Sequence, residues 1–349
     1  MIFLLIFYVF FVTFFCILAL RPFAFHFGLL DIPNERKIHQ GSVPLIGGIA
    51  MFAGVSFGLI FSEIIYIETK YNLLILSSFI ILCVGVFDDY KNISHKLRFL
   101  IQIIVALIIT YFGDVSLKNL GGLFFSNQII YLDEFSILFS VFAILGVLNS
   151  LNFSDGIDGM CASLSLITFL SVGFFGILAG DYLAINIVLC FITSIAAFLV
   201  FNVGLGNKSR FKIFMGDAGS TFLGLAIAWV LIFYTQGADS IFSPVTALWI
   251  YAVPLIDTSS IMIRRISKRK SPFSPDRGHL HHFFIYKGFS EKQALLLIII
   301  MAIAMALIGV MLEINDFPEN LMFYLFIFLS LTYHVVLKRA WKEVDNEQT

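Results

Sequence analysis

Four short polar segments interrupt an otherwise apolar chain of 349 residues. They read FDDYKN (87–92), NSLNFSDGIDGM (149–160), FMGDAGSTFLG (214–224) and SPFSPDRGHLHHFF (271–284). The first three carry carboxylates, and the fourth carries an Asp-Arg pair and three histidines. Ionisable groups next to runs that can enter a bilayer are costly, so they commonly mark a functional site.

Together these residue types suit chemistry on phosphate groups. Carboxylate oxygens bind Mg²⁺, which usually takes one or two of them and completes its shell with substrate phosphates. Glycines let backbone N–H groups approach phosphate oxygens, and helix N-termini favour anions. Arginine and protonated histidine neutralise a diphosphate. The combination predicts phosphoryl transfer at a membrane surface.

The acidic segments also have simpler explanations. Asp88 and Asp89 could mark a helix end, with Lys91 as a solvated partner. The aspartates of DGIDG could cap the next helix, and Asp217 could be the N-terminal charge of another. Capping and catalysis are compatible, because a cap also fixes the position of a carboxylate.

The histidine segment leaves three alternatives open: a zinc site, a solvated loop and a phosphate-binding cluster. Zinc favours N or S ligands, but no cysteine lies near HLHH, and the neighbouring Asp276-Arg277 pair suits an anion better. The basic run RRISKRK (264–270) is explained as a membrane anchor, with Arg264 and Arg265, nearest the membrane, as the exceptions.

The elements that must position these groups are transmembrane helices. The chain is 59% hydrophobic and 13% charged, whereas soluble domains have about 25% charged residues. Its net charge of −1 gives no sign of a nucleic-acid partner. Only helices and closed barrels satisfy their backbone in lipid, and these runs are too long for barrel strands. We expect an all-α polytopic membrane protein of about eleven spans, at 2–20, 45–62, 72–87, 98–113, 137–149, 160–178, 182–201, 217–235, 244–263, 293–312 and 320–337.

Basic residues predict the orientation. With the N-terminus outside and the C-terminus cytoplasmic, all but Lys70 and Lys118 of the 22 lysines and arginines fall on the cytoplasmic side. All four polar segments then meet that same face. We therefore expect one integral-membrane domain over 1–349 with a cytoplasmic cleft. The longest outer loop, 114–135, has two β-prone runs around Ser126-Asn127 and predicts a small external hairpin.

The four segments, in this order and preceded by GLLDIPNERKIHQGSVPLIGG (28–48), resemble the polyprenyl-phosphate N-acetylhexosamine-1-phosphate transferases. The resemblance covers nearly the whole chain. SPFSPDRGHLHH and SPVTALWIYAVPLIDT (243–258) are most similar to the branch of Gram-negative bacteria that uses undecaprenyl phosphate and N-acetylglucosamine. The muramyl-pentapeptide branch has three consecutive histidines, whereas Phe283 follows His281-His282 here.

This resemblance implies a reaction at the bacterial inner membrane. Undecaprenyl phosphate attacks the sugar-bearing phosphorus of UDP-N-acetylglucosamine and UMP leaves, which would begin a lipid-linked surface polysaccharide such as an O-antigen. Mg²⁺, or Mn²⁺ in its place, is the implied cofactor. No ATP site is needed, and the chain has no GxxxxGK[ST] motif. Relatives often form dimers, so a homodimer is left open.

The resemblance also implies roles for individual residues. Asp217 matches the magnesium aspartate, with Asp158 as a second ligand, and Asp88 and Asp89 match an acidic pair that binds or deprotonates the lipid phosphate. The expected contacts to nucleotide, diphosphate and sugar are Asn152, Asp155, Asp158, Asn202, Phe214, Arg265, His279, His281 and His282. Phe214 would stack on uracil. The loop 31–48 would frame the cleft.

One further feature concerns the predicted span 244–263. Pro254 removes a backbone donor there and predicts a bend. The bend would open a lipid-facing groove for the polyprenyl chain, although an ordinary packed kink is the alternative.

Other function classes stay in view. A transporter would also hold acids within a helical bundle, but its acids would lie near the midplane and its halves would repeat. A non-catalytic scaffold would tolerate Asp217→Asn. Among enzymes, another UDP-N-acetylhexosamine donor or a teichoic-acid pathway is the alternative.

Overall fold

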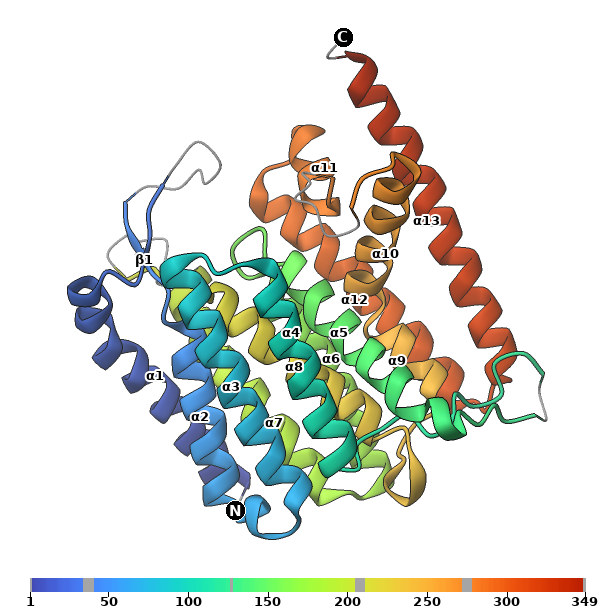
Figure 1. Cartoon of the computed structure of the whole chain (residues 1–349), viewed down its shortest axis with the longest axis horizontal. Helices are drawn as coiled ribbons and strands as arrows, with labels where there is room; N and C mark the ends of the chain where they lie inside the picture. Colours follow the sequence, from blue (N-terminus) through green and yellow to red (C-terminus); the bar gives the residue numbers. More distant parts are fainter. Residues whose placement is uncertain (1, 34–40, 126–127, 205–210, 272–277, 348–349) are drawn as a thin grey trace.

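The computed structural model describes residues 2–33, 41–125, 128–204, 211–271 and 278–347, and they form a bundle of long helices (Figure 1). The helices are α1 (Ile2–Phe27), α2 (Gly47–Phe61), α3 (Thr69–Lys91), α4 (His95–Leu107), α5 (Ser136–Phe153), α6 (Met160–Ala179), α7 (Tyr182–Leu199), α8 (Gly216–Phe233), α9 (Pro244–Ile250), α10 (Ala252–Ser267), α11 (Leu280–Tyr286), α12 (Glu291–Ile314) and α13 (Glu319–Glu347). Helices α4 and α7 each continue as one π-helical turn, Ile108–Phe112 and Val200–Gly204.

Each predicted span coincides with one of these helices, except 244–263, which divides into α9 and α10. Within the described ranges, nine helices are long and apolar enough to cross a membrane, and the bent pair α9–α10 adds a tenth. Helix α2 has only 15 residues, fewer than the about 20 that usually span a bilayer. The chain is therefore a helical protein of the multi-pass membrane type, and the number and direction of the spans stay predictions.

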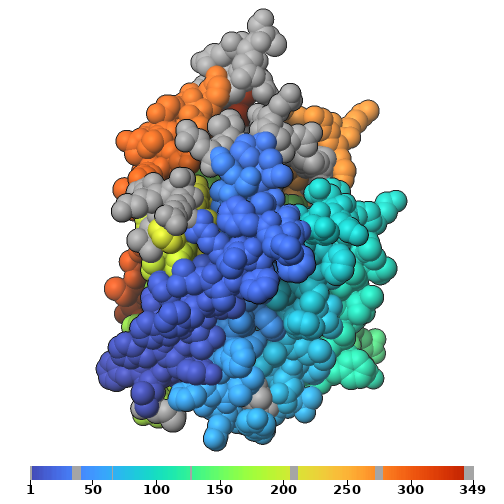
Figure 2. Space-filling model, turned by 90° about the vertical axis from the view of Figure 1, so that its left-hand side faces the viewer, coloured from blue at the N-terminus to red at the C-terminus, as the bar shows by residue number. Residues whose placement is uncertain are grey.

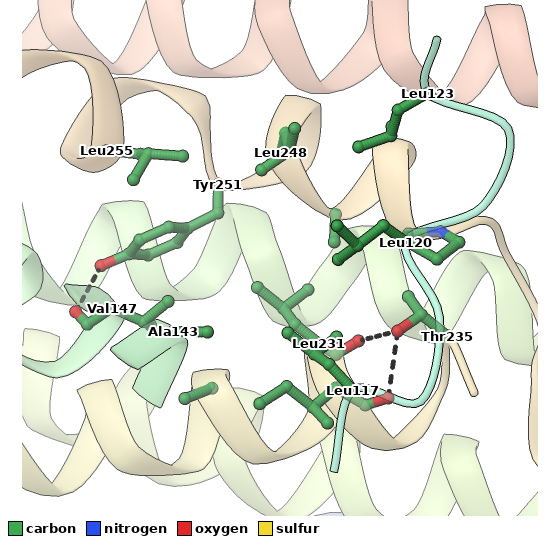
Figure 3. A pocket seen from close by; sticks show the side chains of 14 residues that line it. Leu117, Leu120, Leu123, Ala143, Val147, Leu231, Thr235, Leu248, Tyr251 and Leu255 are labelled. Atoms are coloured by element: carbon green, nitrogen blue, oxygen red, sulfur yellow. Dashed lines mark hydrogen bonds between the residues drawn. The ribbon is translucent and has the colours of Figure 1, made fainter. Parts of the chain in front are cut away.

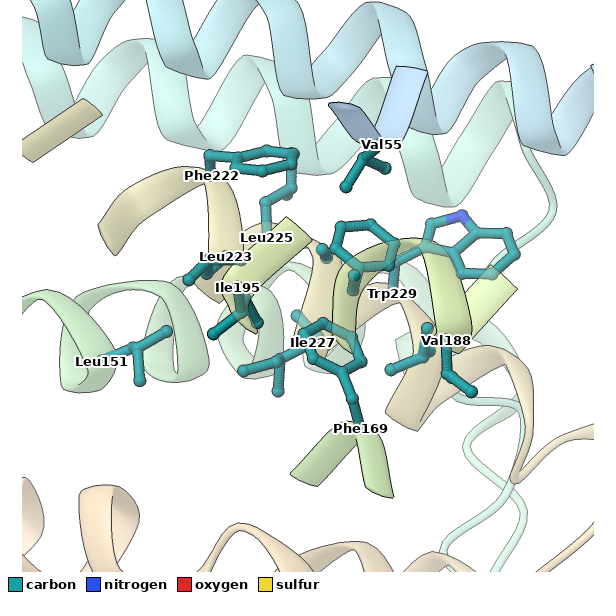
Figure 4. Packing of buried hydrophobic residues seen from close by; sticks show 14 of the residues in the cluster. Val55, Leu151, Phe169, Val188, Ile195, Phe222, Leu223, Leu225, Ile227 and Trp229 are labelled. Atoms are coloured by element: carbon teal, nitrogen blue, oxygen red, sulfur yellow. The ribbon is translucent and has the colours of Figure 1, made fainter. Parts of the chain in front are cut away.

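Helix α8 is the centre of the bundle. All its side chains from Ala218 to Phe233 are buried, and it packs against α2, α3 and α5. Figure 4 shows Phe222 and Trp229 of this helix among side chains of neighbouring helices, such as Val55 and Phe169. A helix that is apolar on all sides belongs in the interior. Asp217, in its first turn, is thereby fixed to the most constrained element of the fold.

Two glycines let neighbouring helices touch the start of α8. A Cβ added at Gly85 of α3 would lie 2.3 Å from the Ala218 Cα, and one at Gly48 of α2 would lie 2.4 Å from the Gly219 nitrogen. Small residues allow such backbone contact between membrane helices. These glycines therefore set how closely α2 and α3 approach Asp217.

The outer surface of the bundle is apolar, as expected for contact with lipid. Helix α1 lies along one side of the molecule (Figure 2). Its phenylalanines at positions 3, 7, 11 and 15 recur every fourth residue and are all exposed, so they share one helix face.

The ends of the bundle contain the departures from an all-α structure. Near the site, Leu30–Asp31 and Val43–Pro44 form a two-stranded antiparallel pair (β1 and β2) that the sequence analysis did not predict. In the outer loop, the described residues show antiparallel bridges at Asn119–Tyr131 and Phe125–Gln128 in place of regular strands. The predicted turn residues 126–127 lie outside the described residues.

Candidate active site

The start of α8 is held by a carboxylate from another helix. Asp89, in the last turn of α3, accepts hydrogen bonds from the backbone N–H of Asp217 (2.8 Å) and of Ala218 (3.2 Å). Gly216 has φ 72°, and a Cβ there would lie 2.4 Å from Asp89 Oδ2, so glycine is required for this approach. Asp89 thus acts as the N-terminal cap of α8 from outside the helix.

The carboxylate of Asp217 lies between a cation and an amide. Arg98 Nη1 donates to Asp217 Oδ2 at 3.2 Å and also to Asp88 Oδ2, while Asn152 Nδ2 donates to Asp217 Oδ1 at 2.8 Å. Asp88 is buried and also accepts from the backbone N–H of Ile93 at 3.0 Å. The simpler explanation of Asp88 as a solvated partner of Lys91 is therefore wrong.

Arg98 is a site residue that the sequence analysis counted only as a topology marker. It lies in the first turn of α4, whose N-cap Ser94 accepts from Leu97 N–H at 3.3 Å. That capped start turns the arginine back toward Asp88, ten residues earlier. A basic residue at the very end of an apolar span, shortly after two aspartates, was the available signal.

The segment NSLNFSDGIDGM divides between a helix and a turn. Asn149 and Asn152 lie in the last turns of α5, where Asn152 also donates to Ser220 Oγ at 2.8 Å. The predicted span 137–149 ended at Asn149, four residues before the helix does. Asn152 thus links α5 to the first turn of α8.

The turn contains two aspartates, Asp155 and Asp158, and Asp155 lies near both Asp158 and Asp217. Asp158 pairs with Lys212 at 2.5 Å. The N-cap residue of α6 is Gly159, and no side chain caps that helix, so the capping explanation fails for Asp158. Asp155 is exposed to solvent. The surrounding protein and the nearby charges of Asp217 and Asp158 raise the pKa of Asp155 above its ordinary value.

The segment before α8 is fixed by the loop that ends at α2. Phe214 N–H donates to Pro44 O at 2.9 Å, and Gly47 N–H donates to Phe214 O at 3.0 Å. The ring of Phe214 is half-buried, with Lys212 Nζ 5.0 Å from its centroid. Asn202 is buried and donates to Ile213 O at 2.9 Å. The predicted frame 31–48 therefore holds Phe214 in place, although residues 34–40 lie outside the described part.

The histidines complete the site. His281 is buried, and neither ring nitrogen has a hydrogen-bond partner among the described residues. Burial, with the nearby rings of His282 and His279, lowers the pKa of His281 to about 3. A Cβ added at Gly156 would lie 2.2 Å from His281 Nε2, so the DGIDG turn touches the histidine segment. Buried imidazole nitrogens usually have a hydrogen-bond partner, and a bound phosphate would be one source of it.

The remaining predicted residues, His282 and Arg265, lie in α11 and α10. We call the side of the site formed by His279, His281 and His282 the histidine wall. The His281 and His282 ring centroids are 4.1 Å apart, and Arg265 is buried in the last turn of α10. Asp276 and Arg277 lie outside the described residues. The structure thus joins all four polar segments at one end of the bundle, through Asp217–Arg98–Asp88 and through Gly156–His281.

The donor set suits a hard cation. Among the described residues, no three His, Cys, Asp or Glu side chains are placed to hold one ion, which gives the zinc alternative no support. Mg²⁺ needs only one or two protein carboxylates when phosphates supply the rest. Asp217 and Asp158 each raise the pKa of Asp155, and their joint binding of Mg²⁺ stays a prediction.

Far from these groups, the bent helix pair borders an apolar cavity. Helices α9 and α10 meet at 83°, with the break at Tyr251, because Pro254 cannot donate to Ile250 O, the last carbonyl of α9. The predicted bend is confirmed. The cavity beside it, of about 190 Å³, is lined by residues such as Leu120, Leu231 and Leu248 (Figure 3).

Comparison with known proteins identifies the family. The sequence profile of glycosyl transferase family 4 matches residues 71–235, which include α3 to α8. Three relatives carry the name undecaprenyl-phosphate alpha-N-acetylglucosaminyl 1-phosphate transferase: those of Escherichia coli O157:H7 (41% identical, covering 95% of this chain and 89% of the relative), Yersinia pestis (39%, 96% and 91%) and Haemophilus influenzae (38%, 97% and 94%).

The chain belongs to this transferase family. Relatives at this identity over almost the full length of both chains share the fold and the enzyme class, so the chain is a membrane phosphoglycosyltransferase. The family match spans Asp88, Asp89, Arg98, Asn152, Asp155, Asp158 and Asp217. The histidine segment lies outside the profile match to residues 71–235, and the nearly full-length similarity to the relatives includes it.

Proposed function

We propose that the chain transfers N-acetylglucosamine 1-phosphate from UDP-N-acetylglucosamine to undecaprenyl phosphate and releases UMP. The observation that carries this proposal is the meeting of Asp217, Arg98 and Asn152 with the histidine wall at one end of the bundle. The excess of basic residues at that end supports a cytoplasmic site in the bacterial inner membrane. The relatives' shared name supports the acceptor and the transferred group.

The reaction exchanges one phosphoanhydride for another. An oxygen of the lipid phosphate bonds to the sugar-bearing phosphorus, while the bond from that phosphorus to the bridging oxygen breaks. UMP leaves with the bridging oxygen. Because a phosphate monoester has a second pKa near 6, its dianion is already the nucleophile at pH 7, so no side chain has to remove a proton. The exchange is reversible.

In this mechanism the acidic pair positions other groups. Asp88 accepts from Arg98 and Ile93 N–H, and Asp89 accepts from two backbone N–H groups of α8. The carboxyl oxygens that accept these bonds hold Arg98 and Asp217 in place. Arg98 then supplies a fixed positive charge for the lipid phosphate.

The other side chains bind the nucleotide sugar. Asp217 and Asp158 would hold Mg²⁺ or Mn²⁺, which when bound neutralises charge on the diphosphate. Phe214 supplies a face for uracil, and Asn152, Asp155 and Asn202 supply further contacts to the nucleotide. The diphosphate and sugar face Arg265, His279, His281 and His282. A diphosphate oxygen would give the buried His281 the partner that it lacks.

The polyprenyl chain requires an apolar path that begins at this polar site. Helix α10 carries Arg265 at its site end, and the 83° bend against α9 and the apolar cavity beside that bend lie farther along the bundle, where such a path would continue. The lipid-linked product would begin a cell-surface polysaccharide.

The test is UMP release by the purified protein with Mg²⁺, undecaprenyl phosphate and UDP-linked GlcNAc, GalNAc or FucNAc in turn. We expect release that requires the lipid and the metal, with GlcNAc as the best donor. Asp217→Asn should abolish it, whereas Asp114→Asn, at an exposed outer aspartate, should not. Failure of every UDP-sugar would contradict the proposal and favour a transporter or a scaffold.

A further inference from the structure

A buried carboxylate outside the four polar segments is tied to the histidine wall. Asp257 lies in α10 and is only 4% exposed. Its Oδ2 contacts His279 Nδ1 at 2.8 Å, while its Oδ1 accepts from Leu280 N–H at 3.2 Å and from Tyr333 Oη at 2.7 Å. One side chain thus joins α10, the start of α11 and the last helix, α13.

These bonds fix which His279 nitrogen faces outward. An ionised carboxylate only accepts hydrogen bonds, so the proton next to it must be on Nδ1. The other nitrogen, Nε2, is then the one available to a ligand. A carboxylate that orients an imidazole in this way is a common device in catalytic and metal sites.

The oriented ring belongs to the candidate active site. His279 stacks on His281, with parallel rings (10°) and centroids 5.8 Å apart, and it lies 6.3 Å from Phe153, the residue after Asn152. Moving His279 would therefore move His281 against Gly156. Among the described residues, the hydrogen bonds of Asp257 reach the substrate-binding groups through His279.

Tyr333 braces the carboxylate from α13. A second bond, Ser260 Oγ to His334 Nδ1 at 2.9 Å, ties the same two helices together. Stability alone does not explain the arrangement, because buried charged pairs replaced by well-packed apolar residues often leave a protein as stable or more stable.

We propose that Asp257 is a positioning residue for the transfer reaction, acting through His279 and held by Tyr333. This inference rests on the proposed function for its activity readout. It makes the last helix part of the catalytic architecture.

The test is a double-mutant cycle of Asp257→Asn and His279→Gln, with kcat and both KM values measured. We expect Asp257→Asn to lower kcat about 10- to 100-fold, as losses of such orienting partners commonly do, with little change in KM for the lipid. Combined with His279→Gln it should add almost nothing, since both act through one ring. Tyr333→Phe should give a smaller loss in kcat, and Asp257→Glu should restore part of it.

Two controls separate this role from a merely structural one. Ser259→Ala on α10 and Thr332→Val on α13 change exposed residues bonded within their own helices, and we expect both to keep full activity and thermal stability. Additive losses in the cycle, or full activity of Asp257→Asn, would overturn the inference.

A measurement without catalysis keeps the two proposals distinguishable. The ¹⁵N signals of His279 in the labelled wild-type protein should show a proton on Nδ1, and Asp257→Asn should change that pattern. A wild-type protein that releases no UMP but shows the Nδ1 proton would refute the proposed function alone. A wild-type ring protonated only on Nε2 would refute the positioning role.

Discussion

Alanine at position 85 would force α3 away from the first turn of α8. The added Cβ would lie 2.3 Å from Ala218 Cα and 2.6 Å from Ala218 N, and neither backbone atom can turn aside. Restoring ordinary contact requires a shift of about 1 Å next to Asp217, and a misplacement of that size costs on the order of 100-fold in rate. Overpacking of this kind also destabilises by about 1–3 kcal/mol.

The assay compares Gly85→Ala with a matched control on α5. Gly146 has open space around its position, so Gly146→Ala should leave kcat unchanged and stabilise the helix by up to about 1 kcal/mol. We expect Gly85→Ala to lose at least tenfold in UMP release and to unfold at lower temperature in detergent. Equal activity and melting temperature for Gly85→Ala and the wild type would refute the close packing of α3 on α8 as the element that fixes Asp217.

Three further perturbations follow from the site. Asp89→Ala removes the cap of α8 and should lower the unfolding free energy by about 1–2 kcal/mol in denaturant titration; unchanged stability would contradict the cap. Arg98→Met leaves Asp88 without its cation and should cost about 3 kcal/mol, at the low end for a broken buried pair because Asp217 is partly exposed; retention of stability and activity would show the arginine to be dispensable. In the folded protein without substrate, His281 stays neutral down to about pH 3. In the unfolded chain it takes up a proton below its ordinary pKa of about 6.5. The free energy of unfolding should therefore decrease as the pH is lowered from about 6.5 to 3, by up to about 1.4 kcal/mol per pH unit. His281→Leu should remove that part of the pH dependence in thermal melts, and an identical pH dependence would contradict the burial of the ring.

The helices could be predicted from the sequence because apolar length decides them locally. Each predicted span has its helix, and the bend near Pro254 follows from one missing donor. The errors lie at helix ends, where polar residues continue a helix and hydropathy no longer indicates it. Asn152 is polar, so the predicted span 137–149 stopped before it, although the helix continues to Phe153.

The candidate site could be predicted only as a set of residue types on one face. The site is held by contacts between segments far apart in sequence: Asp89–Ala218, Arg98–Asp217 and Gly156–His281. No local sequence pattern predicts that such distant segments come into contact. Arg98 was missed because basic residues at span ends are expected for topology alone. Asp257 lies in the segment SPVTALWIYAVPLIDT, but the sequence analysis assigned it no role, since its partners come from α11 and α13.

The most direct test of the convergent site is an experimental structure of the purified protein with UDP-N-acetylglucosamine and Mg²⁺. We expect the diphosphate between Asp217 and His281, the metal on Asp217, and uracil against Phe214. Nucleotide bound away from these residues, or Asp217 and His281 separated with no ligand between them, would contradict the proposal that the four polar segments form one phosphoryl-transfer site.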